Sequence, residues 1–259
     1  MGKLNNRVAL VTGAGRGIGR AIALAFAHGG ARVAAVARSR DELGALVDAI
    51  QSAGGTALAI AADLFDRGAC AKVVSDVRAQ WGPVDILVNN AGLGSSAHPS
   101  PIVDVPVEFW DKTLELNLTV PFLFAKAVVP EMVARRWGRV ITVASIAGRV
   151  GTLHGGAYSA SKHGVMGMMR TLALETAGTG VTVNCICPGP VKTVINDLRI
   201  AYDAQRLGVA VEEFERKLTP IGGRLVPEDI APMAVYFASD EARMVTGQAF
   251  NVCGGLVMS

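Results

Sequence analysis

The fold is decided by one stretch of sequence, residues 12–19, which reads TGAGRGIG. An apolar run at 7–12 leads into it with the composition of a buried strand, and residues 17–28 follow it with the spacing of a helix. Glycines at such a turn let the backbone approach a pyrophosphate closely, and the amino end of the next helix offers free N–H groups. A glycine-rich turn alone is a weak signal. Its place between strand and helix predicts a dinucleotide-binding unit.

The rest of the chain alternates strand-length apolar runs with helix-length segments. The runs lack polar alternation, as expected of strands covered by helices on both faces. This order predicts an α/β fold of the Rossmann type, with a doubly wound parallel sheet and helices on both faces. The expected strands lie at 7–12, 31–37, 56–61, 84–89, 139–144, 181–186 and 249–252, and the expected helices at 17–28, 41–53, 66–80, 107–136, 157–177 and 227–238.

No Pro- or Ser-rich linker and no internal repeat divides residues 1–259, which predicts a single dinucleotide-binding and catalytic domain. The segment 194–219 interrupts the alternation with polar and apolar residues at helical spacing. Ligands of open α/β sheets bind at the carboxyl ends of the strands, so we interpret this segment as a substrate lid. An extra pair of surface helices is the alternative.

Composition excludes several other classes of protein. The chain is 51% hydrophobic and 18% charged with a net charge of +3, so neither a disordered protein nor a nucleic-acid surface is expected. The 4 cysteines form no C-x-x-C motif, which predicts buried, reduced thiols and no metal. We see no secretory signal and no apolar run near the roughly 20 residues of a membrane span. A soluble, cytoplasmic protein without a membrane partner is therefore expected.

The end of the second expected strand decides between the two nicotinamide nucleotides. An acidic residue there would bind the adenosine ribose of NAD. The sequence has Arg38 and no carboxylate in residues 37–40. Arg38, joined by Arg16 from the glycine turn, is expected to clamp a 2′-phosphate. NADP(H) is therefore preferred and NAD(H) stays possible. A solvated loop arginine is the alternative role for Arg38.

A tyrosine and a lysine open the expected helix at 157–177. Tyr158 and Lys162 are four residues apart, so they lie on one helical face. A phenol with a pKa near 10 is a poor base at neutral pH, and a neighbouring ammonium is expected to lower that pKa. Ser145, at the end of the strand at 139–144, is placed to donate a hydrogen bond to the substrate carbonyl oxygen that would receive the tyrosine proton. An exposed helical pair is the alternative.

From about residue 5 to its end, the chain resembles the short-chain dehydrogenase/reductase family. The resemblance rests on the turn at 12–19, NNAG at 89–92, Asn117, Ser145, the YxxxK motif at 158–162, and Pro188-Gly189 with Thr193. In pattern the chain is nearest to 3-oxoacyl-[acyl-carrier-protein] reductases and to polyol or alcohol dehydrogenases. The family implies hydride transfer between NADP(H) and a carbonyl/secondary-alcohol pair.

The resemblance also implies a role for each site residue. Tyr158 is the acid/base, Lys162 lowers its pKa and binds the nicotinamide ribose, and Ser145 polarises the substrate oxygen. Family members of this length are commonly homotetramers. The implied adenine contacts are Asp63 and Leu64, the ribose contact is Asn90, and the carboxamide contacts are Val191 and Thr193. The complete set of predicted cofactor residues is Gly13, Arg16, Gly17, Ile18, Gly19, Arg38, Asp63, Leu64, Asn90, Gly92, Tyr158, Lys162, Val191 and Thr193.

Asn117 is followed four residues later by Pro121. A proline has no N–H to donate, so the Asn117 carbonyl is expected to be free of its usual helical bond. The resemblance places a proton-relay water at this carbonyl. A simple kink between packed helices is the alternative.

The expected substrate pocket is walled by residues 93–96, 146–153, Pro190 and the lid. Thr152 and His154 join Ser145 and Tyr158 as predicted substrate residues, and Ser95, Ser96 and Lys192 are further polar candidates. Such a pocket suits a polyol, a keto-sugar, a hydroxy ester or a cyclic ketone.

Two other functions stay open. A 3-oxoacyl-[acyl-carrier-protein] reductase would dock an acidic carrier helix on basic residues near the site entrance, a region that Arg135 and Arg136 are expected to occupy. The uncharged Thr179, where that subfamily has a basic residue, and the long segment at 194–219 disfavour this function slightly. A non-catalytic nucleotide-binding regulatory protein is disfavoured because serine, tyrosine and lysine are all retained.

Overall fold

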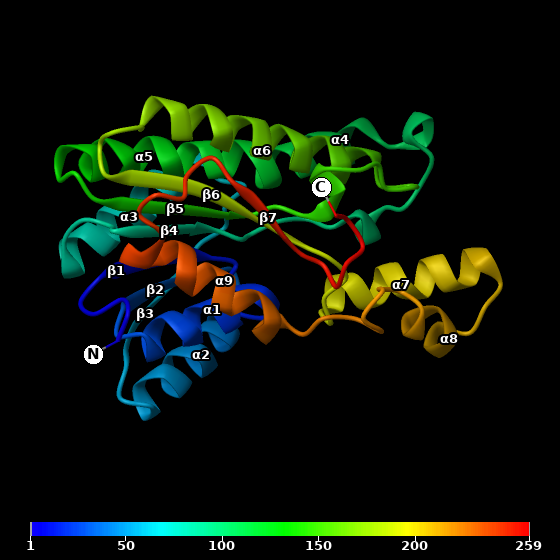
Figure 1. Cartoon of the computed structure of the whole chain (residues 1–259), viewed down its shortest axis with the longest axis horizontal. Helices are drawn as coiled ribbons and strands as arrows, with labels where there is room; N and C mark the ends of the chain where they lie inside the picture. Colours follow the sequence, from blue (N-terminus) through cyan, green and yellow to red (C-terminus); the bar gives the residue numbers. More distant parts are fainter. Residues whose placement is uncertain (1, 259) are drawn as a thin grey trace.

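A computed structural model describes residues 2–258 and contains one seven-stranded parallel sheet (Figure 1). The strand order is β3-β2-β1-β4-β5-β6-β7, which confirms the predicted fold class. The order reverses between β1 and β4, and ligands of such sheets bind at this reversal, beyond the carboxyl ends of the strands. The strands are β1 Val8–Thr12, β2 Arg32–Ala37, β3 Thr56–Ala61, β4 Ile86–Asn89, β5 Gly138–Val143, β6 Val181–Pro188 and β7 Ala249–Val252.

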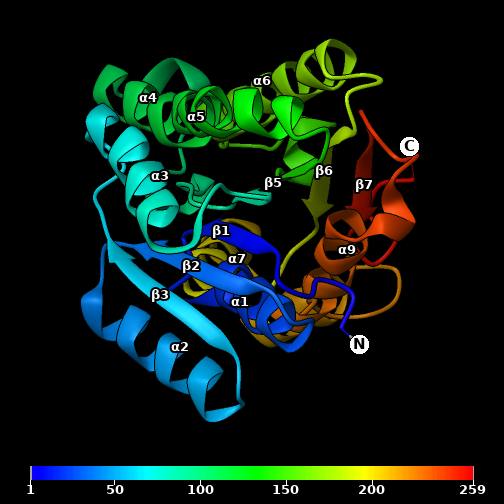
Figure 2. The same cartoon turned by 90° about the vertical axis from the view of Figure 1, so that its left-hand side faces the viewer.

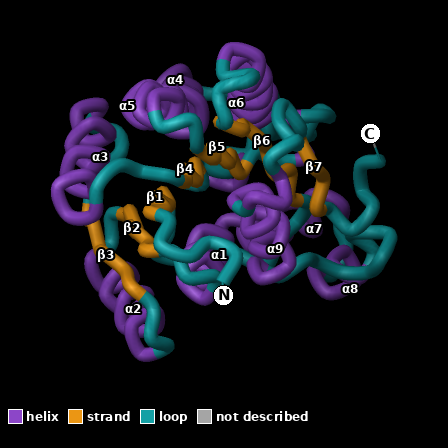
Figure 3. The backbone as a smooth tube through the Cα atoms, turned by 60° about the vertical axis from the view of Figure 1, so that its left-hand side comes forward, coloured by secondary structure: helices purple, strands orange, loops and turns teal. Residues whose placement is uncertain are grey.

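Helices cover both faces of the sheet (Figures 2 and 3). One face packs against α1, α2 and α9, and its core includes Phe26, Leu46 and Phe237. The other face packs against α3, α5 and α6, and its core includes Phe124 and Met169. The helices are α1 Gly17–His28, α2 Arg40–Ser52, α3 Arg67–Trp81, α4 Val107–Leu114, α5 Val120–Ala134, α6 Gly156–Glu175, α7 Val194–Leu207, α8 Val211–Arg216 and α9 Pro227–Ala238.

The central strands are buried throughout. Every residue of β1, β4, β5 and β6 is buried, which confirms the interpretation of their continuous apolar runs. The edge strand β3 is instead partly exposed along its length.

The helix expected at 107–136 is divided in the structure. A π-helical turn, Glu115–Thr119, separates α4 from α5, and the Val120 N–H donates to the Glu115 carbonyl five residues back. Pro121 explains the shift, because it offers no N–H to the carbonyl of Asn117. Such turns interrupt helices at functional sites frequently.

The helical stretch Val107–Ala134 has the length and composition of a membrane span, because an 18-residue window within it has a mean hydropathy of 1.4. The prediction that no segment approaches that length is therefore wrong. In the described structure, however, α5 packs against α3, β4 and β5, and α4 packs against α6. These contacts are those of a core helix.

The segment at 194–219 forms α7 and α8, which project beyond the carboxyl ends of the strands (Figure 1). Gly208 ends α7 in the left-handed conformation, with φ of 68°, and lets the chain turn into α8.

Candidate functional site

The glycine turn joins β1 to α1 and needs its glycines for steric reasons. Gly13 has φ of 64° and Gly17 has φ of 55°, which side chains disfavour. A Cβ atom at Gly19 would lie 2.2 Å from the Gly13 carbonyl oxygen. The Arg16 side chain does not cap α1, so the helix presents its first N–H groups at the turn. This cradle fits a pyrophosphate.

Thr12 and Asn90 join the glycine turn to the loop after β4 by hydrogen bonds. Thr12 Oγ1 accepts hydrogen bonds from the N–H groups of Asn90, at 3.0 Å, and Ala91, at 3.1 Å. Asn90 Nδ2 donates to the carbonyls of Thr12, at 3.0 Å, and Gly13, at 3.1 Å. Asn90, predicted near the riboses, thus has a second role as a support. Thr12 belongs to the motif, but its spacing alone gave no sign of this bracing role.

Two arginines lie at the adenosine end of the expected cofactor site. Arg38 is exposed after β2, beside the glycine turn, where the Ala14 N–H donates to the Val36 carbonyl. The Arg16 side chain is 59% exposed, and its Nη1 lies 3.8 Å from Glu42 Oε1. Sequence reasoning missed Glu42, which is in the first turn of α2. Exposed guanidinium groups beside the turn fit a 2′-phosphate.

The other predicted adenosine contacts differ in exposure. Asp63 is exposed, and its Oδ1 accepts a hydrogen bond from the Phe65 N–H at 3.1 Å. Leu64 is 5% exposed and belongs to the core beside α3. Ile18 packs against the core beside α1.

The predicted catalytic residues gather beyond the carboxyl end of β5. Ser145 follows that strand, and its Oγ accepts a hydrogen bond from the Ala147 N–H at 3.1 Å. Tyr158, in the first turn of α6, lies near enough to Ser145 for the serine side chain to act on the pKa of the phenol. Lys162 Nζ donates to the Val143 carbonyl at 2.9 Å and lies 5.6 Å from the centre of the Tyr158 ring.

The electrostatics differ from the sequence-based expectation. Burial raises the pKa of Tyr158, and the hydrogen bond with Ser145 opposes that rise. Burial lowers the pKa of Lys162 to about 8. The predicted lowering of the Tyr158 pKa is wrong for this structure, because burial is the largest effect on that pKa and raises it. The phenol is therefore kept protonated at neutral pH.

Asn117, in the π-helical turn, connects the loop after β4 to the catalytic helix. It is 1% exposed, and its Oδ1 accepts from the Leu93 N–H at 2.8 Å. Its Nδ2 donates to the Leu93 carbonyl, at 2.9 Å, and to Ser161 Oγ, at 3.0 Å. A Cβ atom at Gly92 would lie 2.9 Å from Asn117 Oδ1. Sequence spacing gave no sign that Leu93 and Ser161 are its partners. The proton relay stays a prediction.

The structure gives His154 a partner in α7 rather than a free position over the site. Its Nδ1 lies 2.6 Å from Tyr202 Oη. Arg199 reinforces this contact, donating to Ser95 Oγ at 3.2 Å and to the Leu153 carbonyl at 2.6 Å. The contact joins His154 to the segment interpreted as a lid, and the substrate hydrogen bond from His154 stays a prediction. The Thr152 carbonyl accepts from the Gly155 N–H at 3.0 Å.

Arg135 and Arg136 lie away from the site. Arg135 Nη1 pairs with Asp85 Oδ1 at 2.5 Å, and Asp85 Oδ2 accepts from the Val8 N–H at 2.9 Å. Arg136 donates to the Gly178 carbonyl at 3.1 Å. These contacts are at the amino ends of β1, β4 and β5. The expectation that this pair lies near the site entrance is thus wrong, because the catalytic residues are at the opposite edge.

Val191 and Thr193 follow β6 and lead into α7. Val191 is 3% exposed, and Thr193 Oγ1 caps α7 by accepting from the Asn196 N–H at 3.3 Å. A Cβ atom at Gly17 would lie 3.1 Å from Thr193 Cγ2, so Thr193 borders the glycine turn. Within residues 2–258, no cluster of three or more His, Cys, Asp or Glu side chains is arranged for a metal ion.

Comparisons with known proteins agree with this arrangement. The family model described as short chain dehydrogenase matches residues 7–201. The granaticin polyketide synthase putative ketoacyl reductase 1 of Streptomyces violaceoruber is 40% identical, over 96% of this chain and 92% of that protein.

Two solved structures are similar over nearly their full lengths. A variant of actinorhodin polyketide ketoreductase with NADPH has a TM-score of 0.92 and 37% identity, covering 99% of each chain. A putative NAD(P) dependent gluconate 5-dehydrogenase from Beutenbergia cavernae, with bound NADP, has a TM-score of 0.87 and 38% identity, covering 97% of each chain.

Proposed function

Because the chain belongs to the short chain dehydrogenase family, we propose that it transfers a hydride between NADP(H) and the carbonyl/secondary-alcohol pair of a small molecule. The observation that carries this proposal is the position of the Tyr158 phenol beside Ser145, with Lys162 one helical turn further on. These groups lie at the same edge of the sheet as the glycine turn, so one ligand-binding edge holds both parts of the site.

In the reductive direction, the Ser145 hydroxyl donates a hydrogen bond to the carbonyl oxygen of the substrate. Tyr158 gives its phenolic proton to the same oxygen as the C–H bond forms, and an alcohol results. In the oxidative direction, the phenolate takes that proton back. The nicotinamide supplies or accepts the hydride when it is bound. The raised pKa of Tyr158 keeps the phenol protonated and suits it to donate.

The cofactor would lie along the carboxyl ends of β1, β2 and β6. Gly13, Gly17 and Gly19 would receive the pyrophosphate, and Arg16 and Arg38 the 2′-phosphate. Val191 and Thr193 would meet the carboxamide. The preference for NADP(H) is supported by the two exposed arginines and by the nucleotides in the two similar structures.

We also propose that the segment at 194–219 is the substrate lid. Its contacts support this role, because Arg199 and Tyr202 of α7 bind the loop that leads into the catalytic helix. The homotetramer that the family resemblance implies and the cytoplasmic location that the sequence predicts both stay predictions.

Exposed apolar side chains surround this loop and the start of the lid. The exposed fractions are 44% for Val150, 57% for Leu153, 56% for Val194 and 59% for Leu198. Such side chains favour a substrate carbonyl carried on an apolar chain or ring over a polyol or keto-sugar. Together with the similarity to ketoacyl reductases, they support 3-oxoacyl thioester reduction as the second candidate function.

A panel of carbonyl compounds tests the proposal. The protein is mixed with NADPH and a keto-sugar, a 3-oxo ester, a cyclic ketone, or a 3-oxoacyl thioester free and on an acyl carrier protein. Loss of the nicotinamide absorbance is expected with the ester or the ketone. A preference for the 3-oxoacyl thioester, free or bound to the carrier protein, would favour the second candidate. No consumption with any compound would contradict the proposal.

A further inference from the structure

The lid is attached to the sheet by two stems that pair with each other. The chain leaves through residues 190–193 and returns through residues 224–226. The Lys192 N–H donates to the Leu225 carbonyl at 2.8 Å, and the Leu225 N–H donates to the Pro190 carbonyl at 3.0 Å. Because the outgoing stem contains Val191 and Thr193, the proposed nicotinamide contacts are part of the lid's attachment.

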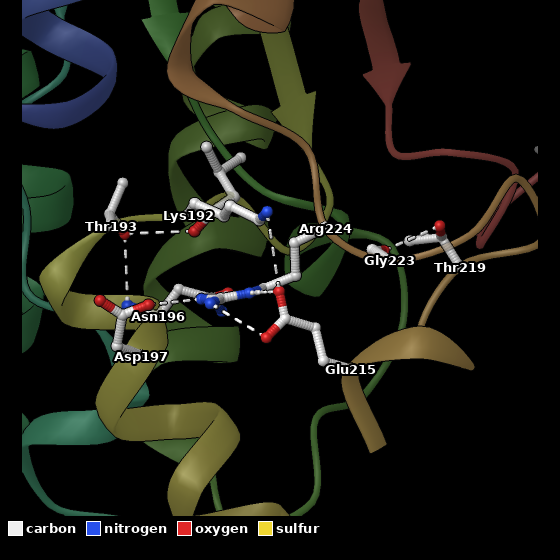
Figure 4. Close-up of polar contacts among 9 residues, drawn as sticks. Lys192, Thr193, Asn196, Asp197, Glu215, Thr219, Gly223 and Arg224 are labelled. Atoms are coloured by element: carbon white, nitrogen blue, oxygen red, sulfur yellow. Dashed lines mark hydrogen bonds and ion pairs between the residues drawn. The ribbon is translucent and has the colours of Figure 1, made fainter. Parts of the chain in front are cut away.

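Arg224, in the returning stem, reaches both lid helices (Figure 4). Its Nη1 donates to Asp197 Oδ1 in α7 at 2.5 Å, and to Asn196 Oδ1 at 3.3 Å. Its Nε and Nη2 donate to the two carboxylate oxygens of Glu215 in α8, at 3.0 and 3.4 Å. One guanidinium therefore holds α7, α8 and a stem together.

The carboxylates of Asp197 and Glu215 are neutralised at this junction only while the Arg224 guanidinium is present. Its side chain is 10% exposed and that of Glu215 is 24% exposed, so solvent screens the pair weakly. Burial alone would lower the pKa of Arg224, but its hydrogen bonds to Glu215 and Asp197 outweigh that effect and raise it. Lys192 Nζ is more distant, at 4.0 Å from Glu215 Oε1. A lysine at 224 lacks the planar fork that serves two carboxylates at once.

The contacts continue from Arg224 to the glycine turn. Asn196, which accepts from Arg224, also donates its backbone N–H to Thr193 Oγ1. Thr193 in turn borders Gly17. A continuous set of contacts thus joins the cofactor edge of the sheet to both helices of the lid.

We propose that Arg224 is a positioning residue that couples cofactor binding along residues 191–193 to the closed position of α7 and α8. The inference rests on the proposed function, because it takes the nicotinamide to bind at this stem. By linkage, closure of the lid tightens cofactor binding by the same factor by which bound cofactor favours closure of the lid.

The variants Arg224→Ala, Arg224→Lys and Glu215→Gln test this coupling. Glu213→Gln is the matched control, because Glu213 lies on the same helix but pairs with the exposed Lys217 at 2.8 Å. Hydrogen exchange of residues 194–223 is measured with and without NADPH, and NADPH affinity is measured by calorimetry. Steady-state rates give KM and kcat for the carbonyl compound.

In the natural protein, NADPH is expected to slow exchange in α7 and α8. Arg224→Ala is expected to remove that protection and raise the Kd for NADPH by about tenfold. It should raise the carbonyl KM more than it lowers kcat, with the pH dependence of kcat unchanged. Glu215→Gln, the milder change, should show part of each of these effects. Arg224→Lys should retain only part of the lid protection and NADPH affinity that Arg224→Ala loses. Glu213→Gln should leave lid protection, NADPH affinity and KM unchanged.

Equal protection of the lid by NADPH in Arg224→Ala and the natural protein would overturn the coupling. So would a Glu213→Gln effect as large as that of Glu215→Gln. Hydrogen exchange and calorimetry need no turnover. They therefore test the coupling through Arg224 even if no carbonyl compound is reduced and the proposed function fails. Absence of any NADPH-dependent protection in the natural protein would also overturn the inference.

Discussion

Lys162 Nζ donates a hydrogen bond to the carbonyl oxygen of Val143, 2.9 Å away, at the end of the strand that leads to Ser145. The lysine is 6% exposed, and the bond fixes its ammonium one turn from Tyr158. The strand and the catalytic helix are thereby joined at the point where the chemistry is proposed. The ammonium is also costly to bury, and that cost can be measured.

The pKa of Lys162 is lowered to about 8, below the value of about 10.4 for a free lysine. Between these pH values the unfolded chain binds the proton and the folded chain does not, so this group adds stability as pH rises. Relative to Lys162→Met, the free energy of unfolding should rise by up to about 1.4 kcal/mol per pH unit above pH 8. Urea unfolding of both proteins from pH 7 to 9.5 measures this. A constant difference would show that the lysine pKa is not lowered.

The raised pKa of Tyr158 predicts opposite pH dependences for the two directions of reaction. Reduction needs the phenol and should be constant through neutral pH, whereas oxidation needs the phenolate and should rise with pH. Ser145→Ala removes the hydrogen bond that lowers the Tyr158 pKa, so the rise in oxidation should move to higher pH. Loss of the donor should also reduce kcat by about a hundredfold. Rate profiles in both directions check this, and a move to lower pH would contradict it.

The sequence predicted the fold class, most bounds of the helices and strands, and the close approach of Ser145, Tyr158 and Lys162 in one site. These features follow from apolar periodicity and local spacing. The sequence did not predict what long-range packing decides. The pairing of His154 with Tyr202, of Asn117 with Leu93, and of Arg224 with Glu215 joins residues with no common motif. The direction of the Tyr158 pKa shift was mispredicted because burial outweighs the opposing effect of Ser145, and burial is a property of the folded chain.

Two glycines provide a matched test of the glycine turn as the pyrophosphate site. Gly19→Ala should abolish nucleotide binding, because its Cβ atom would meet the Gly13 carbonyl oxygen at 2.2 Å. Gly44→Ala, within α2, meets nothing within 4 Å and should stabilise the protein by about 0.5–1 kcal/mol. Calorimetry with NADPH and thermal unfolding measure the two effects. NADPH binding by Gly19→Ala at the natural affinity would exclude the turn as the pyrophosphate site.

The proposed 2′-phosphate site predicts a change in cofactor preference. Arg38→Asp places a carboxylate where the exposed guanidinium now lies, so it should repel a 2′-phosphate and accept a ribose hydroxyl. The ratio of kcat/KM with NADPH to that with NADH should fall by at least about tenfold, a cost of about 1.4 kcal/mol. An unchanged ratio would leave Arg38 a solvated loop residue.

The central claim is that Tyr158 passes the proton during hydride transfer, and Tyr158→Phe tests it most directly. NADPH consumption with the best carbonyl compound is compared in the two proteins, together with NADPH affinity by calorimetry. We expect the natural protein to turn over and the variant to lose activity by about a thousandfold or more while its Kd for NADPH stays the same. Turnover by Tyr158→Phe at the natural rate would contradict the account.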